Sequence, residues 1–128
     1  MTYLWIAIGS ALGGTARYWM ALAVARLTGP EFPWGTILIN ILGSLVIGVF
    51  AALAQPGGRW SVPVEAQAFV MVGLCGGFTT FSSFSLQTLV LLRDGRPGQA
   101  LANVAISVLA CLAATALGYW LAARAAQG

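Results

Sequence analysis

Charged side chains are scarce in this sequence of 128 residues. Asp, Glu, Lys and Arg together make up 7% of it, whereas a soluble globular domain carries about 25%, which excludes a water-soluble monomer. Histidine is absent, and two cysteines without a histidine form neither a metal-binding motif nor a disulfide framework. The sequence also lacks a pair of carboxylates inside an apolar run and a nucleophile beside a base, so we expect no enzyme. The six basic residues are dispersed, without the basic cluster typical of nucleic-acid-binding proteins.

Long apolar runs take the place of the missing charge. A membrane-spanning helix needs about 20 mostly apolar residues. Three runs of 27 residues contain no Asp, Glu, Lys, Arg or His, namely 32–58, 66–92 and 97–123. Each run therefore predicts one span.

A fourth span is expected at the N-terminus, although Arg17 interrupts its apolar stretch. A secretory signal places its positive charge before the apolar run, whereas Arg17 follows it, so we expect this segment to persist in the mature protein. The fold class is then an all-α integral membrane protein with a single transmembrane domain over 1–128. The predicted spans are 2–27, 33–55, 64–92 and 98–123.

Arginine residues are almost evenly divided between the two sides of this topology. Arg59 and Arg124 face Arg26, Arg93 and Arg96 across the membrane. Because the arginine and lysine asymmetry of short loops sets the orientation of insertion, this balance is compatible with insertion in both directions. A single orientation fixed by other features stays open.

The third predicted span contains a string that is unusual for a membrane helix, GGFTTFSSFS at 76–85. Glycine is flexible and hydroxyl side chains compete for backbone hydrogen bonds, so the string predicts a break in the helix. Unwound backbone at membrane depth persists only where it is buried or lines a polar cavity, and its carbonyls can then coordinate a cation. Alternatively, Gly73 and Gly77 allow two helices to approach closely.

Phenylalanines alternate with the hydroxyl residues of this string. The edge of a phenyl ring is electropositive, so two rings presented edge-on favour a small anion. Phe81 and Phe84 are three residues apart, which makes them neighbours on a helix that resumes after the break. The string therefore predicts an anion path.

Polar residues recur at a spacing of four in the fourth span. Ser107, Cys111 and Thr115 share one helix face, with Asn103 and Tyr119 at its margins. This stripe either lines a pore or forms interhelical hydrogen bonds.

An amide and a charge lie inside the first two predicted spans. Asn40 brings an amide that must find partners, either as a structural contact or as a donor toward an anion. Arg17 is the one charge in the interior of a predicted span, away from the span ends, and such a position by default marks a functional site. Alternatively, the Arg17 side chain extends toward the membrane boundary beside Tyr18 and Trp19.

Three motifs make the chain resemble the bacterial fluoride channels of the Fluc or CrcB family, and the resemblance covers nearly the whole chain. They are GGTARY at 13–18, WGTILIN at 34–40 and, most specifically, GGFTTFSSFS at 76–85. The resemblance implies a fluoride-specific channel of the bacterial inner membrane that exports fluoride passively. It also implies an antiparallel, dual-topology homodimer with a structural sodium ion at its centre. Its partners would be fluoride, the lipid bilayer and a second copy of the chain, with no nucleic acid.

The resemblance also implies roles for individual residues. The backbone carbonyls of Gly76 and Thr79 would hold the sodium, Phe81 and Phe84 would line each pore, and Asn40 would be a donor in it. Arg17 would draw anions toward a vestibule. The candidates for a polar track are Ser82, Ser83, Ser107, Cys111 and Thr115. The chain departs from the family pattern at Gln87, where an acidic residue is frequent, and at Cys111, where a hydroxyl is frequent.

Two other classes compete with this interpretation. A small multidrug or cation exchanger needs a carboxylate within the membrane, whereas Glu31, Glu65 and Asp94 lie in loops or at the edge of a span. A non-conducting assembly subunit would account for the polar stripes but not for the TTFSSF string at 79–84.

Overall fold

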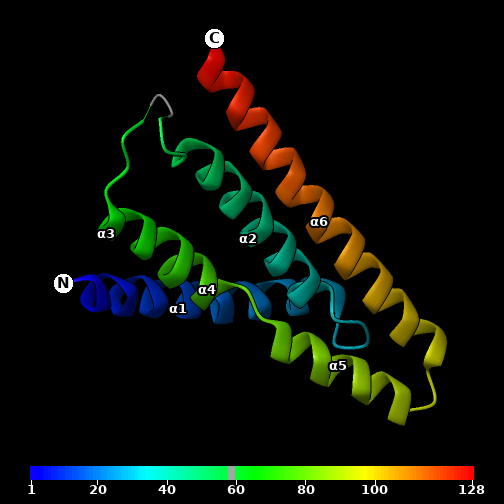
Figure 1. Cartoon of the computed structure of the whole chain (residues 1–128). Helices are drawn as coiled ribbons and strands as arrows, with labels where there is room; N and C mark the ends of the chain where they lie inside the picture. The colour runs from blue at the N-terminus through cyan, green and yellow to red at the C-terminus, as the bar shows by residue number, and fades with distance from the viewer. Residues whose placement is uncertain (58–59) are drawn as a thin grey trace.

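A computed structural model gives the fold and describes residues 1–57 and 60–128. Three of the predicted spans are single helices: α1 (Thr2–Thr28), α2 (Trp34–Leu53) and α6 (Pro97–Gln127) (Figure 1). The third predicted span consists of helical pieces in succession. They are α3 (Val64–Gln67), the π-helical η1 (Ala68–Cys75), α4 (Gly76–Phe78) and α5 (Phe81–Arg93). Within these described ranges there is no strand.

Three segments of the described chain are long and apolar enough to cross a membrane: Trp34–Leu53, Val64–Arg93 and Pro97–Gln127. They confirm three predicted spans and make the chain a multi-pass helical membrane protein. The predicted span 2–27 is one helix, α1, but it is not among these three segments. Its crossing of the membrane stays a prediction. Gly58 and Arg59, which belong to the predicted loop after α2, lie outside the described residues.

Glycine and proline mark the two described chain reversals. α1 ends at Thr28 and is followed by Gly29 at φ +80°, and Gly95 at φ +73° lies between α5 and α6. Only glycine adopts such angles without strain. Pro97 opens α6, where a missing backbone N–H costs no hydrogen bond.

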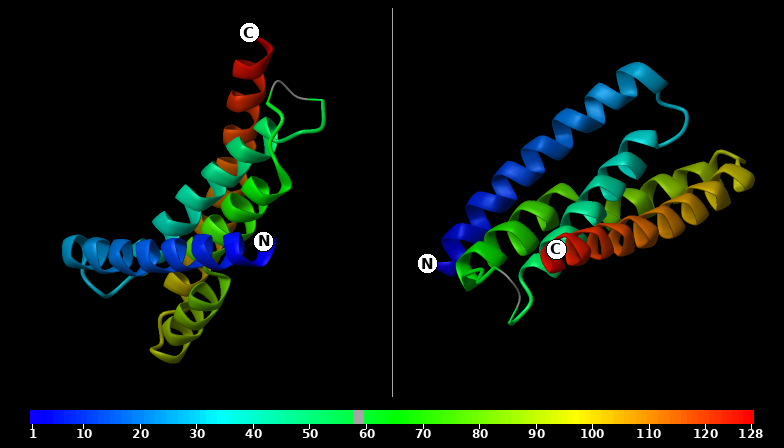
Figure 2. Two further views of the ribbon diagram at one scale, coloured as in Figure 1. Left: turned by 90° about the vertical axis from the view of Figure 1, so that its left-hand side faces the viewer. Right: turned by 90° about the horizontal axis from the view of Figure 1, so that it is seen from above.

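The third span changes its partner halfway along. Its first half packs mainly against α1 through η1 and α4, whereas its second half, α5, packs against α6. α2 and α6 form the most extensive contact and run side by side in every view (Figures 1 and 2). A straight helix could not follow both partners, because α1 runs at a steep angle to α6 (Figure 2).

The predicted break is confirmed, but it lies later in the string than the glycines indicated. Gly76 and Gly77 are helical, and the extended residues are Thr79 and Thr80. Gly77 packs on α1, where an added Cβ would lie 2.7 Å from the backbone oxygen of Ser10. A Cβ on Gly73 would lie 2.9 Å from the backbone oxygen of Ile6. The alternative prediction, close helix approach at these glycines, is therefore also confirmed.

We predict that Gly13→Ala destabilises this contact. A Cβ at Gly13 would lie 2.8 Å from the backbone nitrogen of Phe78, and overpacking of this kind costs about 1–3 kcal/mol. Gly14→Ala is the matched control, because the nearest atom to its Cβ is the Gly77 oxygen at 3.9 Å. Thermal unfolding in detergent should show a lower midpoint for Gly13→Ala alone. Equal midpoints for the two variants would contradict this packing.

Candidate functional site

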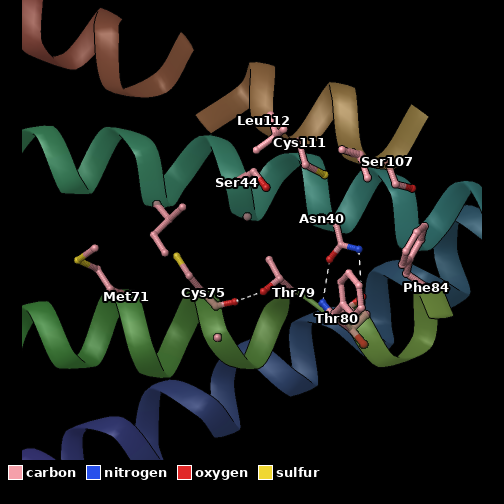
Figure 3. A pocket seen from close by; sticks show the side chains of 15 residues that line it. Asn40, Ser44, Met71, Cys75, Thr79, Thr80, Phe84, Ser107, Cys111 and Leu112 are labelled. Carbon is pink, nitrogen blue, oxygen red and sulfur yellow. Dashed lines mark hydrogen bonds between the residues drawn. The ribbon is translucent and has the colours of Figure 1, made fainter. Parts of the chain in front are cut away.

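The break is an extended step of two residues that is held by a side chain from α2. Thr79 has φ −80° and ψ 158°, and Thr80 has φ −151° and ψ 111°. The N–H of Thr80 donates to Asn40 Oδ1 (2.8 Å), and Asn40 Nδ2 donates to the Thr80 carbonyl oxygen (3.1 Å) (Figure 3). The amide thus satisfies both backbone groups of Thr80, which confirms that it finds partners. The second N–H of Nδ2 is left for another acceptor.

The helix ends on either side of the break have further partners. The Cys75 carbonyl oxygen accepts from the Thr79 backbone N–H (2.9 Å) and hydroxyl (2.8 Å). On the other side, Thr80 Oγ1 accepts from the N–H of Ser83 (3.2 Å) and so caps the start of α5. Across residues 1–57 and 60–128, no hydrogen bond uses the carbonyl oxygens of Gly76 and Thr79.

Arg17 is bonded to the end of the first half of the span. Its Nε donates to the Gly77 carbonyl oxygen over 3.1 Å. A cation is favourable at this position, because the carbonyls at the C-terminus of a helix carry partial negative charge. The side chain is therefore bonded at the break, whereas the neighbouring Tyr18 and Trp19 are 69% and 68% exposed.

A groove of about 410 Å³ lies between α2, the third span and α6 (Figure 3). Seven of the predicted site residues line it: Asn40, Gly76, Thr79, Phe81, Phe84, Ser107 and Cys111. Further lining residues include Ser44 from α2 and Cys75 from η1. Residues predicted from separate parts of the sequence thus share one surface.

The two phenyl rings are neighbours in this groove, as their spacing predicted. The centroids of Phe81 and Phe84 lie 5.3 Å apart, and their planes are tilted by 54°. The Phe84 side chain is 9% exposed, whereas that of Phe81 is 77% exposed. Phe81 therefore projects from the chain into space that this chain does not fill.

The other predicted site residues lie elsewhere. Ser82 is exposed and does not line the groove. Ser83 and Arg17 line a second cavity of about 250 Å³ between α1, α2 and α5, together with Thr80 and Gln87. Gln87 Oε1 is the one buried side-chain polar atom of the described chain without a hydrogen-bond partner.

The polar stripe of α6 divides between its two predicted roles. Ser107 and Cys111 line the groove. Thr115 does not, because it packs on α2, where the carbonyl carbon of Thr115 would lie 3.0 Å from a Cβ on Gly48. Asn103 is buried and donates to Thr88 of α5, which confirms the interhelical interpretation at that position. The pore-lining role of Ser107 and Cys111 stays a prediction.

Sequence reasoning missed Thr80 as a residue of the site. Threonine is a favoured N-cap residue, but Thr79 beside it is equally so, and only the structure identifies Thr80 as the cap of α5. Ser44, Met71 and Cys75 were also missed as groove residues. Ser44 follows Asn40 at a spacing of four, which places both on one helix face, whereas no sequence pattern distinguishes Met71 and Cys75 from ordinary residues of a membrane helix.

Fold and site together define a class: a multi-pass membrane protein with unwound backbone beside a groove between its spans, as in ion-transport proteins. The chain belongs to the CrcB family, because the family model described as "CrcB-like protein, Camphor Resistance (CrcB)" matches residues 4–119. The resemblance drawn from the motifs is thereby confirmed.

Curated relatives support the same family. A protein of Methylocella silvestris named "Fluoride-specific ion channel FluC" is 59% identical over 119 residues, which cover 93% of this chain and 91% of the relative. Proteins with the same name in Rhodospirillum rubrum and Paramagnetospirillum magneticum are 55% and 53% identical, and the matches cover 94% and 93% of this chain and 91% and 93% of those relatives. Because the relatives are named as ion channels, the prediction of a protein that is not an enzyme is confirmed.

We predict that Asn40→Ala weakens the break. The substitution leaves the N–H and C=O of Thr80 without their partner, and an unsatisfied buried polar group costs about 1–3 kcal/mol. The matched control is Ser44→Ala, one turn further along the same wall of the groove. Thermal unfolding should separate the two variants. A midpoint for Asn40→Ala as high as that of the control would show that the amide does not hold the break.

Proposed function

We propose that the chain is a fluoride-specific ion channel that exports fluoride from the bacterial cytoplasm by passive conduction. One observation carries the proposal: the rings of Phe81 and Phe84, the amide of Asn40 and the hydroxyl of Ser107 line the same groove. The names of the relatives, at 53% to 59% identity, support the choice of fluoride as the anion.

The lining of the groove supplies what fluoride requires. Fluoride is small and strongly hydrated, so a pore must replace its water with donors that compensate the desolvation and still release the ion. The spare N–H of Asn40 is such a donor, and the tilted ring pair offers electropositive edges without a charge. Neutral donors hold the anion less tightly than a buried arginine would.

Sodium is the proposed structural ion, and the break offers suitable ligands. The carbonyl oxygens of Gly76 and Thr79 make no hydrogen bond within the described chain, and both residues line the groove. Carbonyls of an unwound membrane segment are the ligands that sodium uses in transport proteins. Bound there, the ion would add positive potential near the anion path. Two carbonyls do not complete a coordination shell, so the site needs ligands from another molecule.

A second, inverted copy of the chain is the proposed source of those ligands. Phe81 is 77% exposed at the edge of the groove, and an antiparallel homodimer would cover it. The even distribution of arginines is compatible with insertion in both orientations. The pore, in this proposal, runs along the interface between the two copies in the inner membrane.

Coupled cation exchange is disfavoured by the position of the acidic residues. Glu31, Glu65 and Asp94 are all exposed, and none lines the groove or the cavity beside Arg17. A proton-coupled exchanger requires a carboxylate within the membrane.

Reconstitution into liposomes tests the proposal directly. We expect the purified protein to release fluoride from loaded vesicles at a rate well above that of empty vesicles, with little release of chloride. Ion-selective electrodes measure both anions. Removal of sodium from both sides should lower the rate of fluoride efflux. Absence of fluoride efflux, or equal efflux of chloride, would refute the proposed function.

The role of the rings is tested by Phe81→Leu and Phe84→Leu. Leucine keeps an apolar side chain but has no electropositive edge, so we expect each substitution to lower fluoride efflux at least tenfold, which corresponds to about 1.4 kcal/mol. Phe69→Leu is the matched control, because Phe69 packs on Trp5 and does not line the groove. Wild-type rates in both ring variants would remove the rings from the mechanism.

A further inference from the structure

Asn103 is the most buried polar side chain among the described residues, with 1% of its surface exposed. It lies in α6 and faces α5, and it does not line the groove. Its Nδ2 donates to Thr88 Oγ1 (2.9 Å), and its Oδ1 accepts from Ser107 Oγ (3.3 Å). The amide therefore connects the helix that carries the phenyl rings with a hydroxyl that lines the groove.

The direction of each hydrogen bond in this chain follows from the number of protons. Thr88 has one hydroxyl proton, and it is donated to the Phe84 carbonyl oxygen over 2.8 Å. Thr88 Oγ1 can then only accept from Asn103, so the amide nitrogen must face Thr88. The amide oxygen must face Ser107, and a carbonyl oxygen can only accept. Ser107 therefore donates its single proton to Asn103.

While its proton points at Asn103, Ser107 offers the groove only lone pairs, which repel an anion. The Ser107–Asn103 bond is long at 3.3 Å, beyond the usual range for a hydroxyl donor, so the proton is held weakly. By contrast, the bond from Thr88 to Phe84 is short, so this end of the chain is fixed.

We propose that Asn103 is a positioning residue that withholds the Ser107 proton until an anion arrives. This inference rests on the proposed function. When fluoride reaches the groove, the Ser107 hydroxyl rotates toward it and leaves Asn103 Oδ1 without its donor. No covalent bond changes in this step. The unsatisfied buried acceptor offsets part of the free energy of anion binding, which weakens the site and speeds release of the ion, as conduction requires.

A double-mutant cycle tests the inference. Asn103→Leu and Asn103→Ala both remove the acceptor, one with a larger and one with a smaller side chain, so a shared effect comes from the lost acceptor and not from volume. We expect each to lower the half-saturating fluoride concentration of efflux about fivefold, the equivalent of one hydrogen bond of about 1 kcal/mol, and to lower the maximal rate. In a Ser107→Ala background both substitutions should leave the half-saturating concentration unchanged.

A purely structural role for Asn103 predicts a different outcome, namely the same shift with and without Ser107, and that result would overturn the inference. Thr15→Val is the control, because the Thr15 hydroxyl bonds within α1 and is exposed. It should match the wild type in both parameters.

A measurement on the wild-type chain keeps the inference testable if the variants do not fold. Titration with fluoride should shift the NMR signals of the Asn103 side-chain amide, although that side chain does not line the groove. Unshifted signals at saturating fluoride would overturn the inference. If the proposed function itself is wrong, the wild-type chain will release no fluoride in the efflux assay, and this result distinguishes the two cases.

Discussion

The pairing of the Asn40 amide with the backbone of Thr80 is the interaction on which the rest of the structure depends. In an apolar environment each unpaired backbone group costs several kcal/mol, so an extended step inside a span requires a partner for both its N–H and its C=O. Asn40 supplies both. The step in turn allows the third span to leave α1 and join α6, which brings the rings of Phe81 and Phe84 to the groove that Ser107 lines.

The same break creates two helix ends of opposite polarity within a short distance. The C-terminal end of α4 carries partial negative charge and the N-terminal end of α5 partial positive charge. Arg17 already occupies one side of the negative end, at the Gly77 carbonyl, and the Gly76 and Thr79 carbonyls are left for the proposed sodium. In this proposal one interruption of the helix provides the ligands of the cation and, immediately after them, the start of the anion path. Nothing in this arrangement requires a buried carboxylate.

Run length and local chemistry predicted most of the fold and part of the site. The apolar runs located the helices, and the glycine and hydroxyl string located the break to within a few residues. Within that string the extended residues are Thr79 and Thr80, whereas Gly76 and Gly77 stay helical. The close contact of Gly77 with α1 is the use of glycine that applies here. The partners of Asn40, Arg17 and Asn103 could not be predicted, since they lie 40, 60 and 15 residues away. Ser107, Cys111 and Thr115 have the same spacing and similar side chains, so the sequence does not show which of them line the groove. Thr115 does not line it, because its backbone packs against Gly48 of α2.

The groups that the described chain leaves unpaired in the groove are those that the proposed ions would bind. They are of two kinds: carbonyl oxygens at Gly76 and Thr79, and the donor of Asn40. An anion cannot satisfy the first kind, and a cation cannot satisfy the second. A surface that presents both kinds of group can bind a cation and an anion at neighbouring positions, and under the proposed function a twofold-related copy would present the same groups from the opposite side. The sodium would then lie where carbonyls of both copies meet, and each copy would contribute its exposed Phe81 to the interface.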